Sequence, residues 1–243
     1  MKKTLLISGV LLALTASIAS AGGINLAWQD CLGAGGQINR SFACNTNAGI
    51  ANDLYVSFDP TASVPDVNGS NPIVDLQSAS TPLPQWWQLK NAGTCRALAL
   101  AANTGPGACA DAWAGQGVAG IAAYYVTANV PTMALNRARI LGSISVPTSA
   151  AQPVAPGTEY FDFIFRINNT KTVGLGACAG CQDPVCLVLN EVLLTSNNSG
   201  DLKMVSPASS NYATWQGGFP ADPNCTVTPT SNKTWGQLKS IYR

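Results

Sequence analysis

Apolar and polar side chains alternate at every second position in several short segments of the chain. In residues 159–167, the odd positions from 161 onward are three phenylalanines and an isoleucine, while Asp162 and Arg166 lie between them. Residues 54–58 and 137–146 repeat this period of two. The period is typical of a β-strand with one face in a core. We therefore expect strands in these segments, with Asp162 and Arg166 on the solvent face.

Residues 185–194 are almost continuously apolar, which predicts a central strand that is buried on both faces. Turn-forming pairs such as Asn68-Gly69 and Pro156-Gly157 separate the apolar segments. Many short strands between such turns predict an all-β protein, built as an antiparallel β-sandwich. The spacing of apolar residues over 234–243 predicts one short C-terminal helix.

The N-terminus is typical of a secretory signal peptide. Lys2 and Lys3 precede an apolar run over residues 5–16, and Ala19-Ser20-Ala21 is a small-residue cleavage site. A membrane anchor is the alternative, but the run is shorter than the about 20 apolar residues that span a bilayer. We expect a secreted protein, at the cell surface or released, with no membrane insertion after cleavage.

Composition and spacing divide the chain into four parts. They are a signal peptide (1–21), an N-terminal disulfide hairpin that belongs to the main domain (22–50), the β-sandwich (51–205), and a disulfide-tethered extension with the short helix (206–243).

All eight cysteines follow the predicted cleavage site, and an even number in an exported chain predicts four disulfides. Proximity along the sequence favours the pairs Cys31–Cys44, Cys95–Cys109, Cys178–Cys186 and Cys181–Cys225. The Cys178-Ala-Gly-Cys181 motif leaves two alternatives open, namely a structural zinc site formed with Cys186 and Cys225, and a redox-active dithiol. Disulfides fit an oxidising compartment better, so we expect no metal and no cofactor.

Composition excludes several kinds of chemistry. The chain has no histidine, which excludes Ser-His-Asp triads, Cys-His dyads and imidazole metal sites. Its formal net charge is +1, with no long run of either sign, so it lacks the positive surface that binds nucleic acid. A hydrolase using two carboxylates stays open as an alternative. Its candidate acids are Glu159 and Glu191, and Glu191 lies in the most apolar segment, where it needs a partner.

Tryptophans provide the candidate ligand-binding residues. Trp86 and Trp87 follow two prolines in an extended segment, so their rings should face opposite ways, with Trp87 buried and Trp86 exposed. An exposed indole can stack on a sugar ring or anchor a protein partner. Trp113 and Trp215, in glycine-rich surroundings, are further candidates. We expect Trp28 in the core.

Several motifs resemble those of secreted proteins of environmental bacteria. The similarity rests on segments 71–77, 83–87, 157–163 and 178–190 and on the ending Thr234-Trp-Gly-Gln-Leu-Lys-Ser-Ile-Tyr-Arg243. It implies export but brings no activity with it. The strand order also resembles cohesin-like and carbohydrate-binding sandwiches, which implies a cohesin-like or jelly-roll type of fold.

The sequence thus predicts a secreted, non-enzymatic adhesion or ligand-binding module whose partner is a polysaccharide or a cell-surface protein. A structural subunit of an extracellular layer or filament is the alternative, because low charge and several disulfides also suit a durable surface protein.

Overall fold

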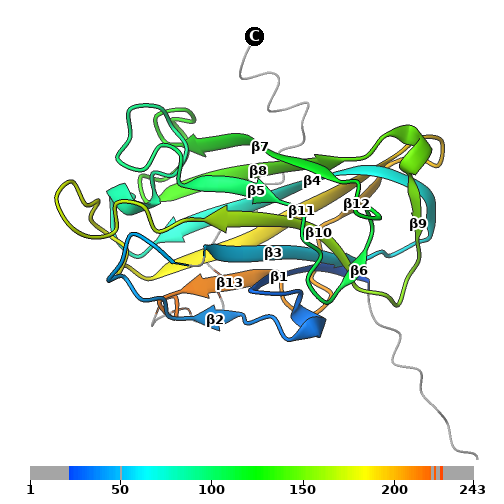
Figure 1. Ribbon diagram of the computed structural model, residues 1–243, viewed down its shortest axis with the longest axis horizontal. Coiled ribbons are helices and arrows are strands. Elements are labelled where there is room, and N and C mark those ends of the chain that lie inside the picture. The colour runs from blue at the N-terminus through cyan, green and yellow to red at the C-terminus, as the bar shows by residue number, and fades with distance from the viewer. Residues whose placement is uncertain (1–21, 50, 220–221, 223–224, 227–243) are drawn as a thin grey trace, which may run out of the picture.

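The computed structural model in Figure 1 describes residues 22–49, 51–219, 222, 225 and 226. The predicted signal peptide and the predicted C-terminal helix lie outside the described residues. Within the described part, no helix is long and apolar enough to cross a membrane.

One layer of the fold is a five-stranded sheet, which we call sheet A. Its strands lie in the order β1 (Gly23–Trp28), β3 (Asn52–Asp59), β10 (Tyr160–Ile167) and β5 (Leu100–Asn103), with β6 (Ala110–Asp111) beside β10. All of these pairs are antiparallel except the one between β6 and β10. The pairing of β1 with β3 makes the N-terminal segment part of this sheet.

The second layer is an eight-stranded sheet, sheet B. Its strands lie in the order β2 (Asn39–Arg40), β13 (Tyr212–Trp215), β11 (Val185–Ser196), β4 (Val64–Ser78), β8 (Arg137–Ser145) and β7 (Val118–Val126), with β12 (Leu202–Met204) beside β11 and β9 (Gln152–Val154) beside β4. The predicted central strand is confirmed, because β11 lies between β13 and β4 and its residues 185–190 are buried. Three short 3-10 turns complete the described elements: η1 (Leu32–Ala34), η2 (Gln85–Trp87) and η3 (Thr148–Ala150).

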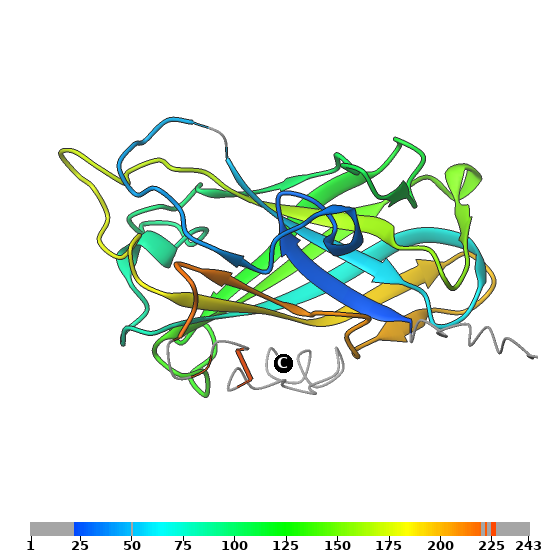
Figure 2. The same ribbon diagram turned by 90° about the horizontal axis from the view of Figure 1, so that it is seen from below.

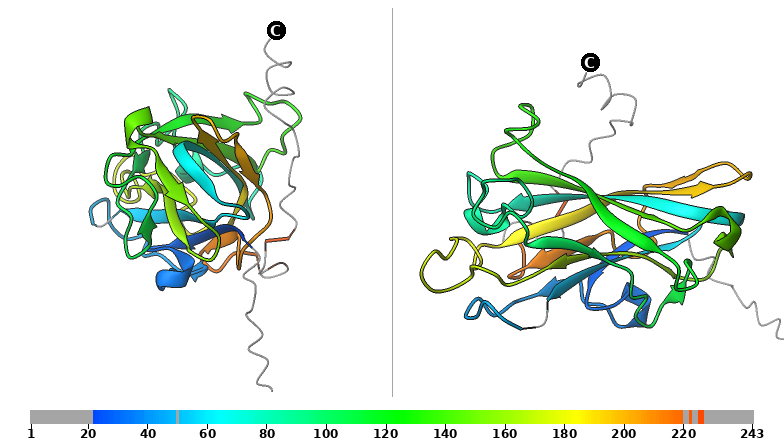
Figure 3. Two further views of the ribbon diagram at one scale, coloured as in Figure 1. Left: turned by 90° about the vertical axis from the view of Figure 1, so that its right-hand side faces the viewer. Right: turned by 45° about the horizontal axis from the view of Figure 1, so that its top comes forward.

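The two sheets face each other around one core, as the view along the strands in Figure 3 shows. Phe163 and Phe165 of β10 point from sheet A toward β8 of sheet B. A Cβ at Gly142 would lie 3.0 Å from the Phe163 ring and 3.1 Å from the Phe165 ring. Gly142 therefore leaves room for the two rings. The structure confirms the predicted all-β sandwich.

A β-bulge overturns part of the alternation predicted for β10. Phe161 is opposite Ser57 and Phe163 is opposite Val56, so Asp162 has no partner on β3. Before the bulge, the facing is the reverse of the predicted one. Phe161 contacts Tyr55 on the outer face of sheet A, whereas Tyr160 stacks on Phe58. The prediction that Asp162 lies on the solvent face is wrong, because the bulge buries it completely.

The two ends of the sandwich differ in the length of their connections (Figures 1 and 2). Four long loops gather at one end, which we call the loop end: residues 41–51, 79–99, 127–136 and 168–184. The opposite end has shorter connections, such as residues 60–63 and 197–201, and we call it the turn end. Loops on a rigid sandwich are where binding residues usually lie, so the loop end is the first place to look for a site.

All eight cysteines form disulfides, as predicted, but every predicted pair is wrong. The bonds are Cys31–Cys109, Cys44–Cys181, Cys95–Cys178 and Cys186–Cys225. Neighbours in the sequence do not pair because the strands carry them apart, whereas the sandwich brings distant loops together. The zinc and dithiol alternatives for Cys178 and Cys181 are overturned with them, since both sulfurs are bonded to other loops.

Candidate functional site: the loop end

The loop of residues 168–184 is tied down at several points. Two disulfides join it to the loop of residues 41–51 and to the loop of residues 79–99. The Asn47 side chain accepts hydrogen bonds from the backbone N–H groups of Thr172 (2.7 Å) and Val173 (2.9 Å). Such cross-links lower the entropy that a loop loses on binding, so this surface is preorganised.

Two of the predicted ligand-binding tryptophans lie beneath this loop and hold it. The Trp86 indole N–H donates to the Thr172 hydroxyl (3.0 Å), and the Trp215 indole N–H donates to the Cys181 carbonyl (2.6 Å). Both rings are completely buried. The prediction that Trp86 is exposed is therefore wrong.

The reason is local backbone structure. Residues 85–87 form the 3-10 turn η2 and not an extended segment, so the Trp86 and Trp87 rings do not point to opposite faces. They meet edge to face, with ring centres 4.9 Å apart. The predicted burial of Trp87 and Trp28 is confirmed.

Trp113, the third candidate, is also in the core. Its indole N–H donates to the backbone carbonyl of Asp162 (2.8 Å), and its side chain is 1% exposed. In this structure Trp86, Trp113 and Trp215 therefore present no ring face to solvent, and the stacking surface that the sequence predicted is absent from all three.

Trp86 and Trp215 belong to an aromatic column with an arginine at each end. The Phe42 ring stacks on Trp215 at 3.9 Å, and Trp215 contacts Trp86 at 4.9 Å. The Arg96 guanidinium lies 3.6 Å from the centre of a Trp86 ring, and that of Arg40 lies 4.8 Å from the centre of the Phe42 ring. Both arginines are placed for a cation–π interaction.

Arg96 is the buried end of this column. Its guanidinium donates to the carbonyls of Trp86 (2.8 Å) and Thr170 (2.9 Å) and to that of Asn168. Burial without a carboxylate partner lowers the pKa of Arg96 to about 9. The arginine stays charged at neutral pH and pins the start of the 168–184 loop to the tryptophans.

The surface of the loop end carries exposed leucines. Leu98, Leu135 and Leu175 are 84%, 59% and 110% exposed, and each lies on a different loop of this end. The other large apolar side chains that are exposed in the described part of the chain, Val118 and Val205, lie at the start of β7 and just after β12. Three of the five exposed large apolar side chains of the described part are thus gathered at one end of the sandwich.

Three small cavities lie between the loops. One of about 370 Å³ is lined by residues 177–183 with Cys44 and Thr172, and another of about 260 Å³ by residues 94–98 with Asn168, Thr170 and Lys171. A third, of about 250 Å³, is lined by Gln29, Arg40, Ala51, Asn52 and Asp53. Each lining combines charged, amide or hydroxyl side chains with small apolar residues, so the three cavities are mixed in polarity.

The two acids considered for hydrolysis have structural partners. Glu159 accepts hydrogen bonds from the Asn25 amide (2.9 Å), the Ser57 hydroxyl (2.6 Å) and the Gly33 backbone N–H (2.7 Å). Glu191 forms an ion pair with Lys203 at 2.5 Å. Glu159 thereby ties η1 to sheet A, and Glu191 ties β12 to β11.

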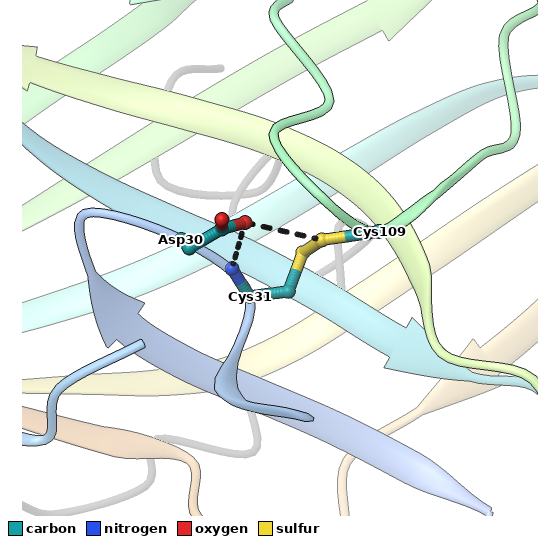
Figure 4. Close-up of side chains that lie close together, drawn as sticks. All are labelled: Asp30, Cys31 and Cys109. Carbon is teal, nitrogen blue, oxygen red and sulfur yellow. Dashed lines mark hydrogen bonds between the residues drawn. A yellow bond between two sulfur atoms is a disulfide. The ribbon is translucent and has the colours of Figure 1, made fainter. Parts of the chain in front are cut away.

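Asp30 and the Cys31–Cys109 disulfide form a compact group, shown in Figure 4. One Asp30 oxygen accepts hydrogen bonds from the backbone N–H groups of Cys31 (2.8 Å) and Ala108 (3.1 Å) and lies 3.8 Å from the Cys109 sulfur. Both sulfurs are used in the disulfide, so they offer no thiolate to a metal ion.

Sequence reasoning missed the residues that now mark this end. Leu98, Leu135 and Leu175 lie in loops without periodicity and among small residues such as alanine and glycine, so no signal in the sequence marked them as exposed. Nothing in the sequence marked Arg40 or Arg96, because only the folded structure shows that each guanidinium lies over an aromatic ring.

We found no family model that matches the sequence and no curated protein that matches it. Among solved structures, the chain is similar to a cohesin module from a family 33 glycoside hydrolase of Clostridium perfringens ATCC13124. The similarity covers 80% of this chain and 93% of that module, with 6% sequence identity and a TM-score of 0.34. At this low TM-score the similarity says nothing about function, which has to be inferred from the site itself.

Proposed function

We propose that this protein is an exported, non-enzymatic adhesion module that binds a protein partner on a cell surface through its loop end. The supporting observation is the position of Leu98, Leu135 and Leu175, one on each of three loops at the same end. Burial of one such side chain in an interface contributes about 1.5–3 kcal/mol. Leu98 and Leu175 lie on loops that the Cys95–Cys178 disulfide joins, and the Leu135 carbonyl accepts from the Leu83 backbone N–H of the first of these loops, so the three loops form one surface.

The same surface favours a protein over a polysaccharide. Sugar rings stack on flat aromatic faces, and the five tryptophans of the described part of the chain are all buried. Exposed leucines near polar side chains, such as Leu98 beside Thr94, Asn168 and Thr170, instead fit a protein interface, which combines an apolar centre with a polar rim. For this reason we prefer the surface-protein partner, and no separate observation favours a filament subunit or a hydrolase.

The disulfides support export. Four such bonds form and persist in an oxidising environment, which is the condition outside the cytoplasm. Release or anchoring at the cell surface then stays a prediction from the N-terminal segment.

The test is binding of the fluorescently labelled mature chain to intact cells of its source organism. We compare untreated cells with cells digested by trypsin and with cells whose sugars have been oxidised by periodate. Saturable binding that trypsin abolishes and periodate leaves intact supports a protein partner. Binding that is lost only after periodate would contradict it, as would an absence of saturable binding.

Variants then locate the surface. Leu98→Ser combined with Leu175→Ser should weaken binding by at least about tenfold, which corresponds to 1.4 kcal/mol. Val118→Ser, a matched control outside the loop end with a side chain that is 73% exposed, should leave binding unchanged. Equal effects of the two changes would show that the loop end is not the binding surface.

A further inference from the structure

The two arginines of the aromatic column are not equally satisfied. Arg96 has three carbonyl acceptors, whereas Arg40 has no ion pair and no side-chain hydrogen bond among the described residues. Arg40 is half-buried, and this burial lowers its pKa, as expected for a guanidinium that has lost water without gaining a carboxylate. Its five N–H groups need acceptors.

Arg40 also lines the cavity of about 250 Å³ at the loop end. The acid in that cavity, Asp53, is already used: both its oxygens accept from Arg166, at 2.7 and 2.6 Å. The Asn52 amide likewise donates to Ile167 and Asn169. Arg40 therefore contributes the unbalanced positive charge of this cavity.

Gln29, on the cavity wall, has an uncommon backbone conformation. Its φ is +75°, a left-handed value that a residue with a Cβ rarely adopts, and its backbone N–H donates to the Asp53 carbonyl (2.9 Å). Strain of this kind persists where the surroundings enforce it, and it often occurs at ligand sites. The exposed Gln29 carboxamide adds a donor and an acceptor at the cavity mouth.

Arg40 is held in place before any ligand arrives. Its guanidinium lies over Phe42, whose backbone is bracketed by the Gln216 side chain: the Phe42 N–H donates to Gln216 Oε1 (3.1 Å), and Gln216 Nε2 donates to the Phe42 carbonyl (2.9 Å). Phe42 in turn stacks on the buried Trp215. A charge fixed on a rigid support loses little entropy on binding.

We infer that the cavity formed by Gln29, Arg40, Ala51, Asn52 and Asp53 is a carboxylate-binding subsite, and that it receives an aspartate or glutamate side chain of the protein partner. A guanidinium matches a planar carboxylate with two parallel hydrogen bonds. The cavity also contains the Asp53 carboxylate, which disfavours a doubly charged phosphate. The choice of a protein as the source of the carboxylate rests on the proposed function.

The test follows the Arg40 side-chain Nε–H resonance by NMR while N-acetylglutamate methylamide is added to the mature chain. We expect a saturable shift of this signal with millimolar affinity, and none with the neutral glutamine analogue. Arg40→Gln should weaken binding by at least about tenfold, while Arg40→Lys retains part of it. Lys90→Gln is the matched control, since Lys90 is an exposed cation of the same end and should not matter.

Three results would overturn the inference. The first is no saturable shift, the second is an equal response to the glutamine analogue, and the third is tighter binding of glucuronate, which would make the ligand an acidic sugar. A melting curve for each variant shows whether it is folded. A subsite that binds the glutamate probe while the chain fails to bind cells contradicts the adhesion proposal alone, so the two failures are distinguishable.

Discussion

Two regions of the protein interior differ in the hydrogen-bond partners that they offer to a buried ionisable group. At the loop end, Arg96 is 2% exposed and its guanidinium donates to three carbonyls. In the middle of the sandwich, Asp162 is fully buried and neither carboxyl oxygen has a hydrogen-bond partner. Burial raises the pKa of Asp162 to about 7, although the nearby Ser70 hydroxyl partly opposes the shift.

The difference shows where a buried charge stabilises the fold. Arg96 organises irregular backbone, because loops have carbonyls that no strand satisfies and a guanidinium can collect several of them. Asp162 lies between two regular sheets whose backbone groups already have partners, so the Ser70 hydroxyl is the one nearby group that opposes the pKa shift of its carboxyl. We therefore expect Arg96 to stabilise the fold and Asp162 to destabilise it once ionised.

The largest effect should come from Arg96→Met. This change removes the donor from three carbonyls, a buried one on Trp86 and partly buried ones on Asn168 and Thr170. A hydrogen bond to a charged group is worth about 1.5–3 kcal/mol, and a partly buried one about half of that, so we expect a loss of about 3–6 kcal/mol in the free energy of unfolding. Chemical denaturation at neutral pH measures it. Arg40→Met, at the exposed end of the same column, should cost less than about 1 kcal/mol. Equal losses would show that the carbonyl contacts of Arg96 do not matter.

The second largest effect should come from the Cys95–Cys178 disulfide, which anchors the loop that carries the Asn168 and Thr170 carbonyls. Cys95→Ala with Cys178→Ala should lower the free energy of unfolding by about 2–4 kcal/mol. The loop of residues 168–184 would then place the Asn168 and Thr170 carbonyls less firmly, so adding Arg96→Met should cost less than it does alone. Full additivity of the two changes would mean that the disulfide and the arginine act independently.

The third prediction concerns pH. The unfolded Asp162 carboxyl ionises near pH 4, while the folded one stays protonated up to about 7, so its contribution to stability is complete below pH 4 and is lost as the pH rises through 7. Between these values the loss is about 1.4 kcal/mol per pH unit. Asp162→Asn should remove that slope, measured by denaturation at several pH values. The exposed control Asp201→Asn should retain it.

The smallest effect should come from the leucines. Leu98→Ser and Leu175→Ser remove exposed side chains, so each should change the free energy of unfolding by less than about 0.5 kcal/mol. Thermal melting tests this directly. A marked loss of stability would mean that these leucines support the loops and are not free for a partner.

The sequence was sufficient to predict the fold class but not its irregularities. Alternation located β3, β8 and β10, and a continuous apolar run located β11, because both patterns are local properties of the chain. The bulge at Asp162 inserts one residue into β10 and reverses the facing of Phe161. No pattern within residues 159–167 indicates the bulge, because it is defined by the register of β10 against β3.

The site was less predictable for a related reason. Placing Trp86 at the surface required residues 85–87 to be extended, and a 3-10 turn of three residues was enough to bury the ring. The disulfide pairs failed because sequence proximity says nothing about which loops meet at the loop end. Contacts between distant loops determine this site, and a single sequence does not show them.

The disulfides overlap along the chain, and this has a consequence for durability. The bonds Cys31–Cys109, Cys44–Cys181 and Cys95–Cys178 together enclose every peptide bond from residue 31 to residue 181. One nick at any exposed loop in this interval leaves both fragments covalently joined, with their strands still paired. Between Cys31 and Cys225, the stretch from Cys181 to Cys186 is the one that no disulfide spans, so a single scission there leaves two fragments without a covalent link.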